Sequence, residues 1–249
     1  MYIHEAIYDP AELLRENLHV HTSFSHCAPA GRTLAVILAE AKQAGLSRIA
    51  ITDHYNTDNS DDKFAAHIAT LRQELAGIQT DIKVFFGAEL SAYGVGKWLE
   101  GDSLRQKLDY RLYACNHYHL AYWEQPEDKS PAGYAKHAMA VATAVIASDH
   151  ADCIAHPFGP GYIKTEVDKQ AICDAITDTM LGDVFTIAKA HQTAIELNAP
   201  SRDPWGLQRR IFNTGRECGV VFNYGTDAHK PGTVDTMQYI REVRRVLLG

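Results

Sequence analysis

The chain has 249 residues, of which 46% are hydrophobic and 22% are charged, and these proportions exclude a disordered, collagen-like or coiled-coil protein. This length admits one barrel-sized domain or two small ones. The 24 basic and 31 acidic residues give a formal net charge of −7, so we expect no bulk binding to nucleic acid and none to a membrane surface.

The start of the chain and its cysteines bear on where the protein works. The first residues, MYIHEAIYDPAELLREN, mix acidic with apolar side chains, which predicts no signal peptide. The longest nearly apolar stretch, Ala138 to Ala147, is about half of a membrane span and predicts a buried helix. The 5 cysteines form an odd set without a C-x-x-C pair, which argues against a disulfide framework or a cysteine-rich structural zinc site and predicts a cytoplasmic protein.

Short β-rich runs alternate with helical patterns along the chain. Residues 33–44 and 60–76 carry apolar stripes at helical spacing, with Gly45 as a stop signal and Ser60 as a start signal. Residues 91–108 fit neither pattern, and we expect a loop or a short helix there. Strands are predicted at 17–21, 47–53, 82–89, 109–116, 152–155, 193–198 and 220–226. Further helices are predicted at 131–149, at 166–191, where Gly182 could break the helix, at 204–218 and at 232–248.

The order of these elements predicts the architecture. Strict alternation of strands and helices implies parallel strands joined by right-handed crossovers. Because no Gly-rich dinucleotide-binding motif is present, we expect a closed or nearly closed α/β barrel rather than an open sheet. The chain shows no internal repeat, low-complexity tract or linker, so we expect one domain over residues 1–249. In such barrels the active site lies at the carboxyl ends of the strands.

Histidine is the unusual residue in the composition, with 13 copies. His19 and His21 form an H-V-H motif at the end of the first predicted strand, and side chains two residues apart on a strand point to the same side. One histidine at a strand end is more often a hydrogen-bonded structural residue, but many at the same end of a barrel predict a metal site. The candidates at this end are His19, His21, His26, His54, His117, His156 and His229, with the carboxylates Glu89 and Asp227.

Other polar residues near these strand ends have simpler interpretations. Asp53 either supports His54 or caps its loop, and Cys27 is expected to be a small buried thiol. His119 is an alternative to His117 but lies further beyond the strand end. Glu196 and Asn198 share one face of the sixth strand and could simply tie the barrel interior to its loops. No function is assigned to His4, His67, His137, His150 and His191.

The motifs LHVHTSFSHC, ITDH, GAEL, CNH, AHPF and GTDAH occur in this order, and together they resemble those of the PHP (polymerase and histidinol phosphatase) domain family. The resemblance covers essentially the whole chain and is closest to the phosphatase branch. It implies a distorted (β/α)7 barrel with three metal ions at its carboxyl end. It also implies ligands for each ion: His19, His21, Glu89 and Asp227 for the first; Glu89, as a bridge, with His117 and His156 for the second; and His26, His54 and His229 for the third.

Imidazoles and carboxylates without a thiolate suit divalent zinc, manganese or iron, and we expect three such ions. A carboxylate-bridged metal pair lowers the pKa of a bound water from 15.7 to about 7, which provides a hydroxide for attack on a phosphate monoester. Arg202, in the loop after the sixth strand, is similar in position to the phosphate-contacting arginine of the family phosphatases, and Lys230 is a weaker candidate. The leaving group needs an acid, for which Asp53 or a water is admissible. The expected catalytic residues are therefore Asp53, Glu89 and Arg202.

Three other functions stay open beside hydrolysis of a small phosphomonoester. An amidohydrolase barrel also begins with H-x-H, but it needs a bridging lysine or its equivalent at the fourth strand, where Cys115, Asn116 and His117 stand. A PHP nuclease or proofreading module would be expected to carry a basic groove or additional polymerase domains. A non-catalytic, metal-stabilised protein would be expected to lack some ligands. The substrate, the identity of the metal and the oligomeric state are not determined by the sequence.

Overall fold

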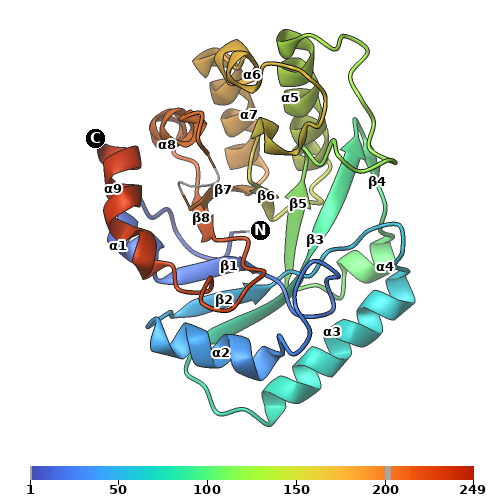
Figure 1. Cartoon of the computed structure of the whole chain (residues 1–249), viewed down its shortest axis with the longest axis vertical. Helices are drawn as coiled ribbons and strands as arrows, with labels where there is room; N and C mark the ends of the chain where they lie inside the picture. The colour runs from blue at the N-terminus through green and yellow to red at the C-terminus, as the bar shows by residue number, and fades with distance from the viewer. Residues whose placement is uncertain (1, 200–202) are drawn as a thin grey trace.

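The computed structural model describes residues 2–199 and 203–249. Its main sheet follows the order β1-β2-β3-β5-β6-β7-β8, all paired in parallel, and the helices surround these strands (Figure 1). The bounds are β1 (Glu16–Val20), β2 (Arg48–Ile51), β3 (Lys83–Gly94), β5 (Tyr110–Ala114), β6 (Cys153–Ala155), β7 (Ala194–Asn198) and β8 (Phe222–Gly225).

The two outer strands of this order, β1 and β8, meet and nearly close the barrel. Val20 and Ala228 form a parallel bridge, and the backbone nitrogens of His21 and Ala228 donate to Ala228 O and His19 O, both at 3.0 Å. The predicted distorted (β/α)7 barrel is therefore confirmed.

The helices begin and end where the sequence signals predict for the first half of the chain. The Ser60 hydroxyl accepts a hydrogen bond from Lys63 N and caps one helix, and Gly45, with a φ of 70°, follows another. None of the helices in the described ranges combines the length and apolarity that a membrane span requires. The helices are α1 (Pro10–Leu13), α2 (Leu34–Gln43), α3 (Asp61–Ala76), α4 (Asp102–Arg105), α5 (Pro131–Ala147), α6 (Lys169–Ala175), α7 (Asp178–Ala190), α8 (Leu207–Cys218) and α9 (Ile240–Leu248).

The predicted helix over 166–191 breaks at a different residue from the one expected. The break lies between α6 and α7 at Ile176, whose backbone is extended, and not at Gly182, which lies inside α7. Thr177 starts the new helix because its side chain accepts a hydrogen bond from Met180 N at 3.1 Å. A side-chain cap therefore decides this boundary, and the glycine is tolerated within the helix.

Two other segments differ from their predicted structure. Within residues 91–108 the short helix α4 agrees with the predicted loop or short helix, but β3 continues to Gly94 and turns through Gly96, with a φ of 69°, into the short antiparallel strand β4 (Lys97–Trp98). Residues 232–248 become α-helical only at Ile240. The first part of that segment forms turns and a short 3₁₀-helix (Met237–Tyr239), and it is tied to the barrel where Asn17 Nδ2 donates to Val234 O at 2.9 Å.

A register shift in β1 brings two adjacent side chains to the inside of the barrel. Asn17 pairs with Ile49, but Val20 pairs with Ile51, so β1 carries one extra residue at this point. Leu18 packs in an interior apolar cluster, while the next residue, His19, contacts Glu196. Such bulges often lie next to active sites because they redirect a side chain. The interior cluster comprises Leu18, Ala50, Tyr110, Leu112, Cys153, Ala155, Ala194 and Val221.

Candidate metal centre

Eight of the predicted ligand residues converge at the carboxyl end of the barrel. His19 lies in β1 and Glu89 in β3, and the others lie at the start of the loops that follow β1, β2, β5, β6 or β8. Within each of three groups, the nitrogen or oxygen atoms that could bind a metal lie within 4.8 Å of one another. The groups are His19, His21, Glu89 and Asp227; Glu89, His117 and His156; and His21, His54 and His229.

Glu89 belongs to both of the first two groups. Its Oε2 atom is 3.3 Å from His19 Nε2 and 3.5 Å from His21 Nε2. Its Oε1 atom is 2.9 Å from His156 Nε2 and 3.4 Å from His117 Nε2. The two oxygens of one buried carboxylate thus face two different sets of imidazoles, which is the arrangement of a bridging ligand.

The residues of the first group fit a divalent metal ion. His19 Nε2 and His21 Nε2 are fully buried and have no hydrogen-bond partner in the described part of the chain. The other ring nitrogens are occupied, because His19 Nδ1 lies 2.9 Å from Glu196 Oε1 and His21 Nδ1 lies 3.2 Å from Ser25 Oγ. A buried nitrogen without a partner is costly, and a cation at this point would satisfy both nitrogens. Imidazole and carboxylate donors suit zinc, manganese or iron.

The environment keeps several of these groups in the protonation state that metal binding needs. Burial lowers the pKa of His21 to about 3, and the neighbouring charge of His54 acts in the same direction. Burial also holds the pKa of His117 well below its usual value, against the attraction of Glu89. For Glu89 burial acts in the opposite direction, but the charges of His54 and His19 outweigh it and hold the carboxyl pKa well below its usual range. Bare ring nitrogens and an ionised carboxylate are the ligating forms.

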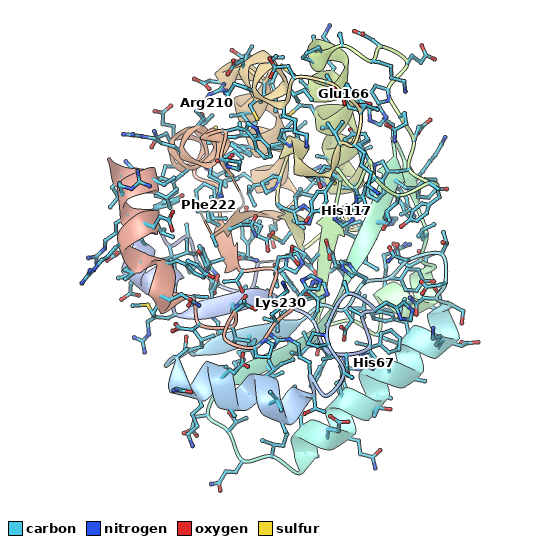
Figure 2. All side chains as sticks on the ribbon, viewed as in Figure 1. His67, His117, Glu166, Arg210, Phe222 and Lys230 are labelled. Atoms are coloured by element: carbon cyan, nitrogen blue, oxygen red, sulfur yellow. The ribbon has the colours of Figure 1, made fainter. Side chains whose placement is uncertain are left out.

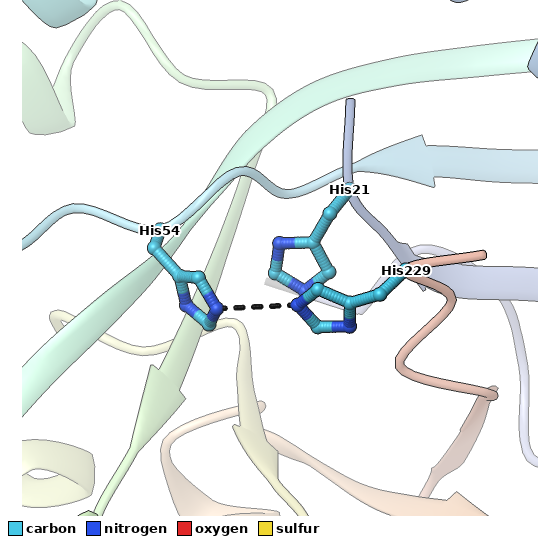
Figure 3. A group of neighbouring side chains, drawn as sticks. All are labelled: His21, His54 and His229. Atoms are coloured by element: carbon cyan, nitrogen blue, oxygen red, sulfur yellow. Dashed lines mark hydrogen bonds between the residues drawn. The ribbon is translucent and has the colours of Figure 1, made fainter. Parts of the chain in front are cut away.

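The third group contains His21 in place of the expected His26. His54 Nε2 and His229 Nε2 lie 3.3 Å apart, and His21 lies beside them (Figure 3). The side chain of His26 is 86% exposed, and its Nε2 lies 2.9 Å from Asp58 Oδ2. The structure therefore does not bring His26 into the cluster, because its loop turns the imidazole outward.

Cys27, the next residue on the same loop, is exposed, so the expectation of a buried thiol is wrong. Its thiol lies beside His229 and His54 and lines a pocket together with them. Partial burial opposes the thiolate, but the interactions with these two histidines outweigh it and lower the pKa of Cys27 to about 6.

Two residues without an assigned role hold the imidazoles in place. Glu196 Oε1 faces His19 Nδ1 at 2.9 Å, and its Oε2 accepts a hydrogen bond from His156 N at 2.6 Å. Asn116 Oδ1 lies 3.0 Å from His156 Nδ1. Burial disfavours the charged form of His19, but Glu196 and Glu89 raise its pKa well above the usual value, so a metal at this position displaces a proton. The alternation of β7, which places Glu196 on the interior face, is the signal that could have identified it.

Asp53 does not face the metal ligands. Its buried carboxylate accepts hydrogen bonds from Thr22 N, Thr22 Oγ1 and Ser25 Oγ at 2.7–2.8 Å, and His67 Nε2 lies 2.9 Å away. Burial raises its pKa, but the contacts with His67 and its other partners outweigh burial and lower it. An ionised carboxylate surrounded by donors has no proton to give, so the role of general acid does not fit Asp53. Instead, Asp53 fixes the loop after β1 together with His67, which lies on α3 (Figure 2).

Two of the grouped residues adopt an uncommon backbone conformation. His156 has a φ of 28° and Asp227 a φ of 53°, a region that side chains other than glycine rarely occupy. Both residues directly follow strands or lie one residue further on, where the chain leaves the barrel. Strained backbone of this kind persists where the surrounding structure holds it, and it concentrates at functional sites.

Two pockets open over the centre. One, of about 450 Å³, is lined by His54, His117 and His229, and the other, of about 280 Å³, by His156; Tyr162 lines both. Of the two fourth-strand candidates, His117 belongs to a ligand group, whereas His119 stacks on Tyr162 with ring centroids 5.2 Å apart.

Of the two candidate phosphate contacts, Lys230 and Arg202, the structure describes only Lys230. Lys230 is exposed in the loop after β8 (Figure 2). It lines a small pocket together with Asp227 and His229. Arg202 lies outside the described residues.

The fold and the three ligand groups define a PHP-type metallohydrolase architecture. The PHP domain model matches residues 17–200, and the chain belongs to the PHP domain family, as its motifs predict. The chain is 29% identical over 245 residues to the probable phosphatase YcdX of Escherichia coli K12, an alignment that covers 93% of this chain and 84% of the relative. It has the same identity to the YcdX protein of Shigella boydii serotype 18.

A solved structure supports the same fold. The histidinol phosphate phosphatase HISK of Lactococcus lactis, complexed with zinc, L-histidinol and phosphate, superimposes with a TM-score of 0.63 at 15% sequence identity. The match covers 94% of this chain and 92% of that protein. The expectation of a metal-dependent hydrolase fold is therefore confirmed.

Proposed function

We propose that this chain is a phosphatase that hydrolyses a small phosphomonoester with the help of three divalent metal ions. The observation that carries the proposal is the position of Glu89, whose two oxygens face separate imidazole sets at 2.9–3.5 Å. In this proposal His19, His21, Glu89 and Asp227 hold the first ion, and Glu89, His117 and His156 hold the second. His54 and His229 contribute to the third.

The similar proteins support this choice of reaction. The curated relatives are probable phosphatases, and the solved protein with the same fold was complexed with zinc, L-histidinol and phosphate. We therefore place this chain among phosphatases of the histidinol-phosphatase type, with a small phosphorylated alcohol as substrate.

The chain's own residues prepare the site for this chemistry. When bound, the metal ions supply a nucleophile from water near neutral pH and positive charge for the phosphate oxygens. Glu196 and Asn116 fix the orientations of His19 and His156, so the ligand geometry is present before substrate binds. Lys230, which lines a pocket with Asp227 and His229, is proposed to contact the phosphate, and Arg202 is proposed for the same role.

The pockets favour a small substrate over a nucleic acid or a peptide. Within the described residues, neither of the two pockets over the centre is lined by lysine or arginine, so the basic groove of a nuclease is absent there. For an amidohydrolase, the bridging ligand would come from the fourth strand of the barrel, which is β5. Here the residue that belongs to two ligand groups is Glu89 on β3. Both alternatives therefore fit the geometry less well than a phosphomonoesterase.

The test is the turnover of matched esters by metal-loaded protein. Apo-protein reloaded with zinc or manganese is offered p-nitrophenyl phosphate, L-histidinol phosphate and other phosphomonoesters, with bis(p-nitrophenyl) phosphate as the diester and an amide as the amidohydrolase substrate. We expect the monoesters to be hydrolysed fastest, with loss of activity on chelation and recovery on adding metal. Faster diester or amide hydrolysis, or no turnover by folded protein with a full metal complement, contradicts the proposal.

A further inference from the structure

The loop after β1 carries two adjacent donor side chains that point in different directions. The His26 side chain is 86% exposed and pairs with Asp58. The Cys27 thiol instead lies close enough to interact with His54 and His229, and it lines the pocket that opens over this pair. The loop therefore presents sulfur, and not imidazole, to the third group.

His54 and His229 both direct one ring nitrogen into the same space. His54 Nδ1 lies 2.7 Å from Glu89 Oε2, and His229 Nδ1 lies 2.9 Å from the backbone oxygen of Asp227. Because these oxygens only accept hydrogen bonds, both imidazoles carry a proton on Nδ1, so Nε2 is the atom that each can offer to a metal. The two Nε2 atoms are 3.3 Å apart and within hydrogen-bond distance (Figure 3), so one of them carries a proton, which a cation bound between them would displace.

His21 points to a ligand at this position but does not complete the site. A ring nitrogen of His21 lies within 4.8 Å of the ligand atoms of both histidines, and its buried Nε2 has no hydrogen-bond partner among the residues that the structure describes. The same Nε2 also lies 3.2 Å from Asp227 Oδ1 and 3.5 Å from Glu89 Oε2, in the first group. One nitrogen lone pair binds one ion, so metals in both groups leave the third with two histidines and one protein ligand missing.

We propose that Cys27 supplies this ligand as a thiolate, so that Cys27, His54 and His229 hold the third metal ion and leave one position open to the pocket. The thiol proton passes to solvent when the metal binds. The thiolate adds a negative charge and a soft donor to two neutral imidazoles, which makes this site prefer zinc to manganese. This inference rests on the proposed metal centre but not on the proposed reaction.

Cobalt(II) titration of the apo-protein, followed by absorption spectroscopy, tests the ligand directly. Wild-type protein is expected to show a near-ultraviolet sulfur-to-cobalt charge-transfer band. Cys27→Ser is expected to lose that band and about one bound cobalt ion per chain. The matched control, His26→Ala, removes the adjacent donor on the same loop and is expected to keep both. A band that survives in Cys27→Ser, or that disappears in His26→Ala, overturns the proposal.

Alkylation of the wild-type protein provides a second readout that does not depend on the folding of a variant. Zinc is expected to slow the reaction of iodoacetamide with Cys27 by at least about tenfold, because a metal-bound thiolate is a poor nucleophile. The half-buried Cys218 serves as the internal control and is expected to react equally with and without zinc. Equal rates at Cys27 in both conditions overturn the proposal. Neither readout uses a phosphate ester, so it stays interpretable if the protein proves not to be a phosphatase.

Discussion

Replacing Glu196 by glutamine tests whether a residue outside the ligand set controls the metal centre. The carboxylate contacts two partners at once: His19 Nδ1 at 2.9 Å and His156 N at 2.6 Å. A glutamine presents one oxygen and one NH2 group, so in either orientation one of these nitrogens faces another donor. The Glu196→Gln variant also removes the charge that orients His19.

The expected loss of zinc affinity follows from the contact that the Glu196→Gln variant cannot make with His19 or His156. A buried donor left without an acceptor costs about 1–3 kcal/mol. Loss of a partner that orients a metal-bound histidine lowers metal affinity by about 10–100-fold, which corresponds to about 1.4–2.7 kcal/mol. The two figures agree, so we expect Glu196→Gln to weaken zinc binding by about 10–100-fold while the barrel stays folded.

The assay is a zinc titration in competition with a chromophoric chelator, together with thermal unfolding of the apo-protein. The control is Glu16→Gln, since Glu16 is as deeply buried but lies at the start of β1, where it pairs with His4 and Arg48. This control is expected to lower stability without changing zinc affinity. Unchanged zinc affinity in Glu196→Gln, or equal weakening in both variants, refutes the argument.

Three further substitutions test other parts of the account. Glu89→Gln removes the bridging charge and is expected to lower kcat/KM on the best phosphomonoester by about 10³-fold, measured on protein shown to be folded by circular dichroism; near wild-type turnover contradicts the bridge. Lys230→Ala is expected to raise KM more than it lowers kcat in steady-state kinetics, and an unchanged KM removes it from the phosphate site. Burial opposes the charged form of His4, but its contact with Glu16 outweighs burial and raises its pKa. His4→Gln should therefore cost about 1 kcal/mol of unfolding free energy below pH 6.5, with the difference shrinking as pH rises through the raised pKa; a pH-independent difference in chemical denaturation contradicts this.

The convergence of ligands could be predicted because parallel strands fix which ends meet. His19, Glu89 and His156 lie far apart in sequence, but each occupies or directly follows a strand of the barrel. Once the alternation of strands and helices implied a barrel, the strand ends had to share one face. This convergence of the strand ends does not depend on the conformation of the loops.

The roles of residues in the loops could not be predicted from the order of the strands. His26 and Cys27 are adjacent, and only the course of the loop decides which of them faces His54. The role of Asp53 was equally hidden, because its hydrogen-bond partner His67 comes from the next helix and carries no motif of its own. These outcomes depend on side-chain packing between elements, which periodicity in the sequence does not encode.

The central claim is that three metal ions surround Glu89 and its neighbours, and anomalous X-ray scattering from crystals of zinc-loaded protein tests it most directly. We expect two peaks about 3.5–4 Å apart on either side of the Glu89 carboxylate. We expect a third peak between Cys27, His54 and His229. A single peak, or peaks that Glu89 does not touch, would contradict it.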